Sequence, residues 1–349
     1  MSDDAQGTTT VKGIDVPRVT EWFEANIPGA QGPLQFSLIA GGHSNLTFGV
    51  TDATGRRYVL RRPPLGHVLA TAHDMKREHT IISALASTDV PVAPALGLCT
   101  DEAVNGAPFY VMDFVDGRVL RDMAAVDQLP VEARRTASLS IADTLAKIHA
   151  VDPDAVGLGE LGKKEGYIER QLKRWYSQFQ QSQTREVPKV DEVHDALLAR
   201  IPEQGPAAIV HGDYRLDNCM TDDDGNVIAV LDWEICTLGD PLADVGLLMV
   251  YWTEASDSHP ALLTAPTAAE GFLGRQALLD RYAEVSGRDL SQIDFYVAFG
   301  YWKLACIVEG VYTRYVNGAM GSDASGFEGF ALQVERSAEA AADAVARLG

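Results

Sequence analysis

The sequence predicts an α+β fold in which a small β-rich N-terminal lobe is followed by a large α-rich C-terminal lobe. Between residues 34 and 114, short apolar runs are separated by Gly, Asn and Asp turns, as is typical of strands. After Gly117 the apolar residues recur every three or four positions, which predicts amphipathic helices. The chain has 349 residues, 46% of them apolar, and this is enough to build a core in each of two lobes.

The N-terminal lobe is expected to span residues 21–115, after a flexible, mainly polar tail over residues 1–20. Five strands and one helix are predicted in it. The strands cover residues 34–39, 46–51, 58–61, 95–99 and 109–114, and the helix covers 73–87. Turns are predicted at Gly41-Gly42, at residues 52–55 and at Asn105-Gly106.

The C-terminal lobe is expected to span residues 116–349, after a hinge near residues 114–118. Its first helices are predicted over residues 131–150 and 168–179. The second carries one apolar stripe, formed by Ile168, Leu172, Trp175 and Phe179. Two short strands interrupt the helices at 208–210 and 227–231, and helices return from Pro241 onwards.

The charge and the cysteines limit the class of protein. Acidic residues outnumber basic ones by 49 to 29, and a net charge of −20 argues against nucleic acid or an anionic membrane as a partner. The four cysteines show no metal-binding spacing, which favours reduced thiols in a cytoplasmic protein. The N-terminus lacks the pattern of a signal peptide, and no apolar run is long enough to cross a bilayer. The oligomeric state cannot be inferred from these features.

The clearest chemical motif is H-G-D-Y-R-L-D-N at residues 211–218, directly after an apolar strand. Asp232 comes 14 residues after Asn218, at the end of the next apolar strand. Phosphoryl transfer needs a carboxylate near the attacking hydroxyl and hard oxygen ligands for Mg²⁺, and these residues can supply both. The alternative is that they only form turns.

The motif H-G-D-x-x-x-x-N followed by L-D-W-E at residues 231–234 resembles the aminoglycoside phosphotransferase family, which includes choline kinase-like enzymes. It is also similar to the catalytic loop of protein kinases, and the resemblance extends over about residues 34–251. It implies a two-lobe protein-kinase-like fold with a nucleotide-binding N-terminal lobe, a catalytic and substrate-binding C-terminal lobe, and ATP and Mg²⁺. Asp213 would then be the catalytic residue at the acceptor hydroxyl, and Asn218 and Asp232 would bind the metal.

A glycine turn between the first two predicted strands is a candidate phosphate-binding element. It contains Gly41, Gly42, Ser44 and Asn45. Glycines let the backbone approach a phosphate, whose oxygens then accept from the amides. The resemblance implies that this turn covers the triphosphate.

The periodicity also predicts a buried ion pair. Met75, Glu78, Ile82 and Leu85 share one helix face, so Glu78 is expected to point inward, where a carboxylate needs a cation. Val59 and Arg61 share one face of the third strand. By resemblance, Val59 covers the adenine, while Arg61 replaces the usual phosphate-binding Lys and pairs with Glu78. The alternative places both charges in solvent.

The strand over residues 109–114 resembles the one that leads into the kinase hinge. That resemblance implies that backbone groups from Asp113 to Val115 bind adenine and that Met112 lines the pocket.

Four other polar features are expected to be structural. Asp240 would cap the helix that begins at Pro241, and Asp244 would brace the catalytic loop through His211. The run of three Asp at residues 222–224 before Gly225 fits a hairpin turn better than a calcium loop. His149 lies on an apolar stripe and is expected to pack.

The leading hypothesis is an Mg-ATP-dependent phosphotransferase that acts on a hydroxyl of a small molecule. A nucleotide-binding pseudokinase, suggested by Arg61, and a metal-dependent hydrolase built on His211, Asp213 and Asp232 are the alternatives. Gly157-Leu158-Gly159 and the helix after it most resemble kinase-like domains fused to some acyl-CoA dehydrogenases. That likeness suggests a hydroxyacyl or similar acceptor, but the sequence does not identify it.

Overall fold

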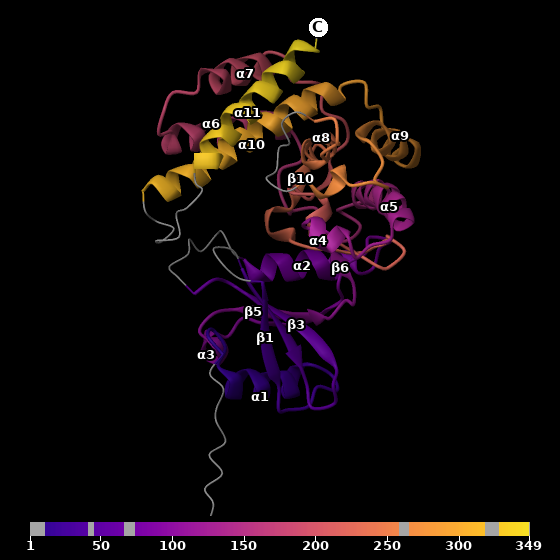
Figure 1. Ribbon diagram of the computed structural model, residues 1–349. Coiled ribbons are helices and arrows are strands. Elements are labelled where there is room, and N and C mark those ends of the chain that lie inside the picture. Colours follow the sequence, from indigo (N-terminus) through magenta and orange to yellow (C-terminus); the bar gives the residue numbers. More distant parts are fainter. Residues whose placement is uncertain (1–10, 41–44, 66–73, 258–264, 318–327, 349) are drawn as a thin grey trace, which may run out of the picture. The chain divides into compact units, whose positions relative to one another are not determined.

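The computed structural model describes residues 11–40, 45–65, 74–257, 265–317 and 328–348. The chain divides into two compact units, Met1–Asp116 and Gly117–Gly349 (Figure 1). The first unit is built around an antiparallel sheet and the second is mainly helical, so the predicted fold class is confirmed.

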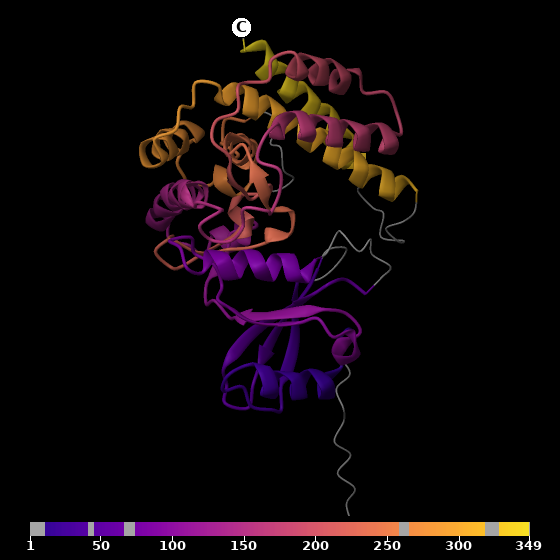
Figure 2. The same ribbon diagram turned by 180° about the vertical axis from the view of Figure 1, so that it is seen from behind.

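The N-terminal unit contains a five-stranded sheet in the order β1-β2-β3-β5-β4, with every neighbouring pair antiparallel. The strands are β1 (Gln35–Ala40), β2 (Leu46–Thr51), β3 (Arg57–Arg62), β4 (Ala95–Cys99) and β5 (Phe109–Asp113). Helices α1 (Val16–Asn26) and α2 (Met75–Leu85) lie on opposite sides of this sheet (Figures 1 and 2). Tyr58 and Leu60 of β3 face α1, while Arg61 faces α2.

Helix α1 begins inside the segment predicted to be a flexible tail, so that prediction is wrong for residues 16–20, while residues 1–10 lie outside the described residues. The Asp15 carboxylate accepts a hydrogen bond from the amide of Arg18 and so caps the helix, and Pro17 occupies its first turn. Val19 and Phe23 lie one helical turn apart, and both are fully buried against the sheet. The ring of Phe23 meets that of Tyr58 edge to face, with centroids 5.7 Å apart. In so short a helix, the apolar residues alternate with charged and polar ones, so the sequence alone carries only a weak helical period.

The predicted turn at Asn105-Gly106 proves to be the end of a short helix. Helix α3 (Glu102–Asn105) is capped by Asp101 and stops at Gly106, whose φ of 71° lies in the left-handed region. Gly106 does reverse the chain direction, as predicted, but one helical turn precedes it.

The C-terminal unit is a helical assembly around one long central helix, α10 (Ile293–Val316), which packs against its neighbours α6, α8 and α11. The other helices are α4 (Met123–Val126), α5 (Val131–Ala150), α6 (Tyr167–Ser182), α7 (Pro188–Leu198), α8 (Leu242–Tyr251), α9 (Arg275–Ser286) and α11 (Glu328–Ala346). Helices α8 and α10 approach closely at Gly246, where a Cβ would lie 2.4 Å from the backbone of Tyr296. A side chain there would push apart the helices that support the site.

Two small sheets carry the loops that matter for function. Strand β7 (Ala208–Val210) pairs with β10 (Thr237–Gly239), and β6 (Arg118–Val119), β8 (Cys219–Thr221) and β9 (Val227–Val230) pair in the order β6-β8-β9. The hairpin between β8 and β9 contains the run of Asp residues. The Asp222 carboxylate accepts from the amides of Asp224 and Asn226, so the predicted hairpin turn is confirmed. Among the helices that the structure describes, none has the length and apolar character to cross a membrane.

We expect Phe23→Ala to lower the free energy of unfolding by about 3–5 kcal/mol, because the ring fills the space between α1 and the sheet. Glu21→Ala, on the exposed side of the same helix, is the matched control and should stay within about 0.5 kcal/mol of wild type. Urea unfolding followed by circular dichroism measures both. Equal stability of the two variants would show that the Phe23 ring does not anchor α1 to the sheet.

Candidate active site

The catalytic loop, residues 211–218, begins directly after β7 and ends in a single 3₁₀ turn, Leu216–Asn218. The Asn218 side-chain amide donates to the Asp213 backbone oxygen over 2.8 Å and to its carboxylate over 3.0 Å. The loop is therefore folded so that Asp213 and Asn218 are held together. Because both bonds use the amide nitrogen, the Asn218 Oδ1 atom remains for another ligand.

Asp232 follows β9 with φ 62° and ψ 61°. In the part of the chain that the structure describes, it is the one non-glycine residue with a positive φ. This left-handed conformation is unfavourable for most L-residues, although Asp and Asn tolerate it best. The amide of Leu231 donates to the Asn218 carbonyl over 2.8 Å, so Asp232 starts directly beside the end of the catalytic loop. Backbone strain at this position is a reason to suspect a functional constraint.

Asp244 on α8 fixes the start of the loop, as the sequence predicted. Its carboxylate accepts from the backbone amides of His211 (2.7 Å) and Gly212 (2.9 Å), so the brace acts on the backbone and not on the imidazole. Nε2 of His149 lies 3.4 Å away, and its Nδ1 contacts the Tyr282 hydroxyl over 2.7 Å. Burial alone would raise the pKa of Asp244, but these bonds outweigh it, and its pKa is lowered. His149 is thus packed, as expected, and also supports Asp244.

His211 uses both ring nitrogens inside the protein. Nε2 lies 2.8 Å from the Leu231 carbonyl, to which it donates, and Nδ1 accepts from the Asp213 amide over 3.3 Å. The ring packs against Trp233, with centroids 4.8 Å apart. A side chain with both nitrogens engaged connects the catalytic loop to the strand before Asp232. It is poorly placed to act as a base.

The residue that caps helix α8 is one position later than the predicted cap, Asp240. Helix α8 begins at Leu242, with Pro241 as the capping residue. Asp240 precedes it, and its carboxylate still accepts from the Leu242 amide over 3.1 Å and from the Tyr296 hydroxyl over 2.6 Å. The first helical residue was therefore predicted one position too early, but Asp240 does stabilise this helix end.

The N-terminal unit contains the ion pair that the periodicity predicted. Arg61 Nε lies 2.9 Å from Glu78 Oε2, and Glu78 is only 1% exposed. Tyr110, which lies opposite Arg61 in the β3–β5 pairing, donates its hydroxyl to Glu78 over 3.0 Å. The Asn45 side chain donates to the other carboxylate oxygen over 2.7 Å. Three donors thus surround one buried carboxylate.

The structure describes only some of the other residues predicted to bind the nucleotide. Gly41, Gly42 and Ser44 lie outside the described residues. The Asn45 side chain faces Glu78, so a phosphate contact would have to come from its backbone. Val59 and Met112 lie opposite each other on β3 and β5, both partly exposed.

The predicted hinge residues lie at the end of β5, where Asp113 is the last residue of the strand and Val115 comes two positions later. The Asp113 amide donates to the Pro94 carbonyl over 2.9 Å, and its carboxylate pairs with Arg56 over 2.9 Å. The Asp113 amide is therefore not available to an adenine ring. The ring would have to hydrogen-bond to the Asp113 carbonyl or to the backbone of the half-buried Val115.

A pocket of about 470 Å³ opens beside Asp213 within the C-terminal unit. Helices α6, α8, α10 and α11, the catalytic loop and the turn after Asp232 line it, through Trp175, Gly212, Asp213, Arg215, Asp217, Ile235, Tyr251, Lys303, Leu304, Ile307, Val308, Phe330 and Gln333. The sequence did not single out Lys303, although it is a cation within the otherwise apolar run at residues 302–308. Arg215 and Asp217 stood inside the recognised motif without an assigned role.

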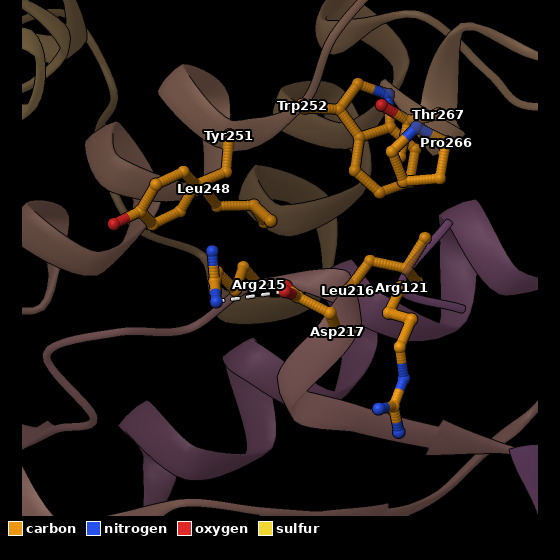
Figure 3. Close-up of a pocket in the computed structure, with 9 residues that line it drawn as sticks. All are labelled: Arg121, Arg215, Leu216, Asp217, Leu248, Tyr251, Trp252, Pro266 and Thr267. Atoms are coloured by element: carbon orange, nitrogen blue, oxygen red, sulfur yellow. Dashed lines mark ion pairs between the residues drawn. The ribbon is translucent and has the colours of Figure 1, made fainter. Parts of the chain in front are cut away.

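Arg215 connects the acidic groups of the loop. Its guanidinium lies 2.9 Å from the Asp217 carboxylate and 3.6 Å from that of Asp213, and it stacks over the Tyr251 ring. Figure 3 shows the pair of Arg215 and Asp217 below Tyr251, in a second pocket of about 20 Å³. That space holds about one water and no substrate. Burial and the charge of Asp213 raise the pKa of Tyr251, so its hydroxyl stays protonated.

Comparison with known proteins decides the family. The sequence profile of the phosphotransferase enzyme family matches residues 35–285, well over half of the chain. The chain belongs to the phosphotransferase enzyme family. Acyl-CoA dehydrogenase family member 10 of Mus musculus is 34% identical over 83% of this chain but only 27% of its own length. Member 11 of the same species is 34% identical over 89% of the chain and 41% of its own length. The chain therefore spans less than half of these relatives.

Solved structures support the same assignment. A candidate aminoglycoside phosphotransferase from Ralstonia eutropha JMP134 is 35% identical, with a TM-score of 0.81 over 95% of this chain and 98% of that one. Choline kinase from Cryptosporidium parvum Iowa II has a TM-score of 0.65 over 95% of this chain and 97% of its own, at 12% identity, and so shows the fold alone. The resemblance seen in the sequence is confirmed, and this phosphotransferase family member has the kinase-like fold of its relatives.

For this phosphotransferase family member, we expect Arg61→Ala to reduce the free energy of unfolding by about 3–5 kcal/mol, because it leaves a buried carboxylate without its cation. Arg57→Ala on the same strand removes the exposed pair with Asp116 and should cost about 1 kcal/mol or less. Urea unfolding of Arg61→Ala, Glu78→Ala and the double variant gives the coupling free energy. Additive effects of the two changes would show that the pair contributes nothing of its own.

Proposed function

We propose that this chain is an Mg-ATP-dependent phosphotransferase that transfers the γ-phosphoryl group to a hydroxyl of a small molecule. The observation that carries the proposal is the fixed position of Asp213. Asn218 holds it from one side, the Asp244-bound backbone holds it from the other, and it lines the larger pocket. A carboxylate fixed beside a substrate-sized pocket can orient an acceptor hydroxyl and accept its proton.

Asn218 and Asp232 are the proposed metal ligands, and the donor set fits the task. Mg²⁺ prefers oxygen ligands and is usually bound by one or two protein groups together with substrate phosphates and waters. Asn218 presents Oδ1, because its nitrogen is bound to Asp213, and the left-handed backbone of Asp232 fixes where its carboxylate starts. In the described ranges no three His, Cys, Asp or Glu side chains form a metal cluster, consistent with a site that nucleotide oxygens complete. The ion would neutralise charge on the phosphates.

The N-terminal unit would supply the nucleotide contacts. Arg61 pairs with Glu78 through Nε, and its planar guanidinium has the fork geometry that suits a phosphate. Val59 and Met112 would contact the adenine ring, and backbone groups from Asp113 to Val115 would bind its edge. Gly41, Gly42, Ser44 and Asn45 would approach the triphosphate with their backbone.

A screen of hydroxylated small molecules for ATP consumption tests the activity. It should include hydroxylated acyl compounds, since the relatives carry the name of acyl-CoA dehydrogenases. Phosphorylated product supports the proposal. Nucleotide binding without turnover on any acceptor would favour a pseudokinase, and metal-dependent hydrolysis without ATP would favour a hydrolase.

Asp213→Asn should lower kcat by about 10²–10⁴-fold while ATP affinity stays near that of wild type, because Asp213 acts on the acceptor and not on the nucleotide. Steady-state turnover and isothermal titration with ATP measure the two effects. Asp224→Asn, the same substitution in the exposed hairpin, is the control and should change neither. A near-normal kcat in Asp213→Asn would exclude the proposed role.

Magnesium should strengthen ATP binding to the wild type, and Asp232→Asn should remove most of that gain. Asn is the suitable replacement, since it tolerates the left-handed backbone that Ala would strain. Titrations of ATP with and without Mg²⁺ give the ratio of the two dissociation constants. If the variant and Asp224→Asn keep the wild-type ratio, the metal binds elsewhere.

A further inference from the structure

Lys303 is a buried cation that the phosphoryl transfer described above does not use. It lies in the middle of α10 between Trp302 and Leu304, and it is only 6% exposed. Desolvation lowers the pKa of its ammonium. Burying an ammonium is costly unless it is paired and hydrogen-bonded, so its presence requires a compensating contact.

Contacts within the protein satisfy only part of the hydrogen-bonding capacity of the Lys303 ammonium. Nζ donates to the Gly212 carbonyl over 2.9 Å and lies 5.6 Å from the centroid of the Trp175 ring. An ammonium has three N–H donors, so two remain available toward the pocket that Lys303 lines. The carboxylates of Asp213 and Asp244 are near enough to favour the charged form, but no ion pair joins Lys303 to a carboxylate of the described residues.

Of the four charged side chains that line the pocket, three contact one another and Lys303 is the fourth. Arg215 lies against both Asp213 and Asp217, so these three groups form their own cluster. The pocket also has apolar lining from Leu304, Ile307 and Val308, which follow Lys303 on α10, and from Phe330 of α11. A ligand in this pocket therefore meets one cation without a carboxylate partner at the edge of an apolar surface.

We propose that Lys303 is a specificity-determining residue, which binds a carboxylate or carbonyl oxygen of an acceptor whose body is apolar. Acceptors with an amine at this position are rejected, because the two ammonium groups would repel each other beside the apolar part of the pocket. The orientation of the acceptor rests on the proposed function, since it assumes that the reacting hydroxyl lies at Asp213. The binding preference itself does not depend on turnover.

Three probes of equal chain length test this preference: hexanoate, hexanamide and hexylamine. Their dissociation constants are measured by NMR titration of the full chain at constant ionic strength, with wild type, Lys303→Met and Lys303→Arg. We expect wild type to bind hexanoate or hexanamide about tenfold or more tightly than hexylamine, as one hydrogen bond to a charged group provides. Lys303→Met, which keeps the length and apolar stem, should remove the preference, and Lys303→Arg should retain part of it.

A purely structural role at Gly212 would lower the thermal midpoint of Lys303→Met but leave the ratio between probes unchanged, and that result overturns the proposal. Tighter binding of hexylamine by wild type, or no binding of any probe, overturns it as well. Hexanoate without hexanamide binding identifies a carboxylate as the group that is recognised, and equal binding of both identifies the carbonyl oxygen. Turnover on some acceptor without the preference would reject this inference alone, whereas the preference without turnover on any acceptor would reject only the proposed function.

Discussion

The arrangement of the catalytic loop depends on one buried carboxylate. Asp244 accepts from two consecutive backbone amides, and these directly precede Asp213. An anion enclosed in this way is far more stable than an unpaired one, and it fixes the backbone in one conformation. The His211 ring then extends the same restraint to the strand that ends before Asp232. The positions of Asp213, Asn218 and Asp232, the three groups assigned to phosphoryl transfer, thus depend on the Asp244 carboxylate and on the contacts next to it.

The N-terminal unit also contains a buried carboxylate that is surrounded by hydrogen-bond donors, but its donors are side chains. Glu78 is as buried as Asp244, and it is surrounded by donors from Asn45, Arg61 and Tyr110. Such a cluster contributes little net stability compared with apolar residues of equal volume, because desolvating the charges offsets their attraction. What it provides is a defined direction for the guanidinium of Arg61. In the proposed function, that direction is what lets Arg61 contact a phosphate.

Periodicity and motif spacing predicted those parts of the site that depend on local sequence. The inward direction of Glu78 and the shared face of Val59 and Arg61 follow from helix and strand geometry alone. The inward-facing side chain of Asn45 and the left-handed backbone of Asp232 could not be predicted, because tertiary contacts set both. Helix α1 was missed for the same reason, since its two core residues acquire meaning only against the sheet.

The kinase-like fold does not determine the acceptor, because proteins that share it at 10–12% identity are named for substrates as different as spectinomycin and choline. In the proposed function, specificity comes from the helices around the pocket, where the local charge differs from that of the whole chain. The chain has a net charge of −20, but the charged groups that line the pocket are Asp213, Asp217, Arg215 and Lys303, which sum to zero. A polycationic acceptor would find both carboxylates already in contact with Arg215. The cation that remains, Lys303, favours an electron-rich group on an apolar body, so this pocket differs in chemistry from one built to attract amines.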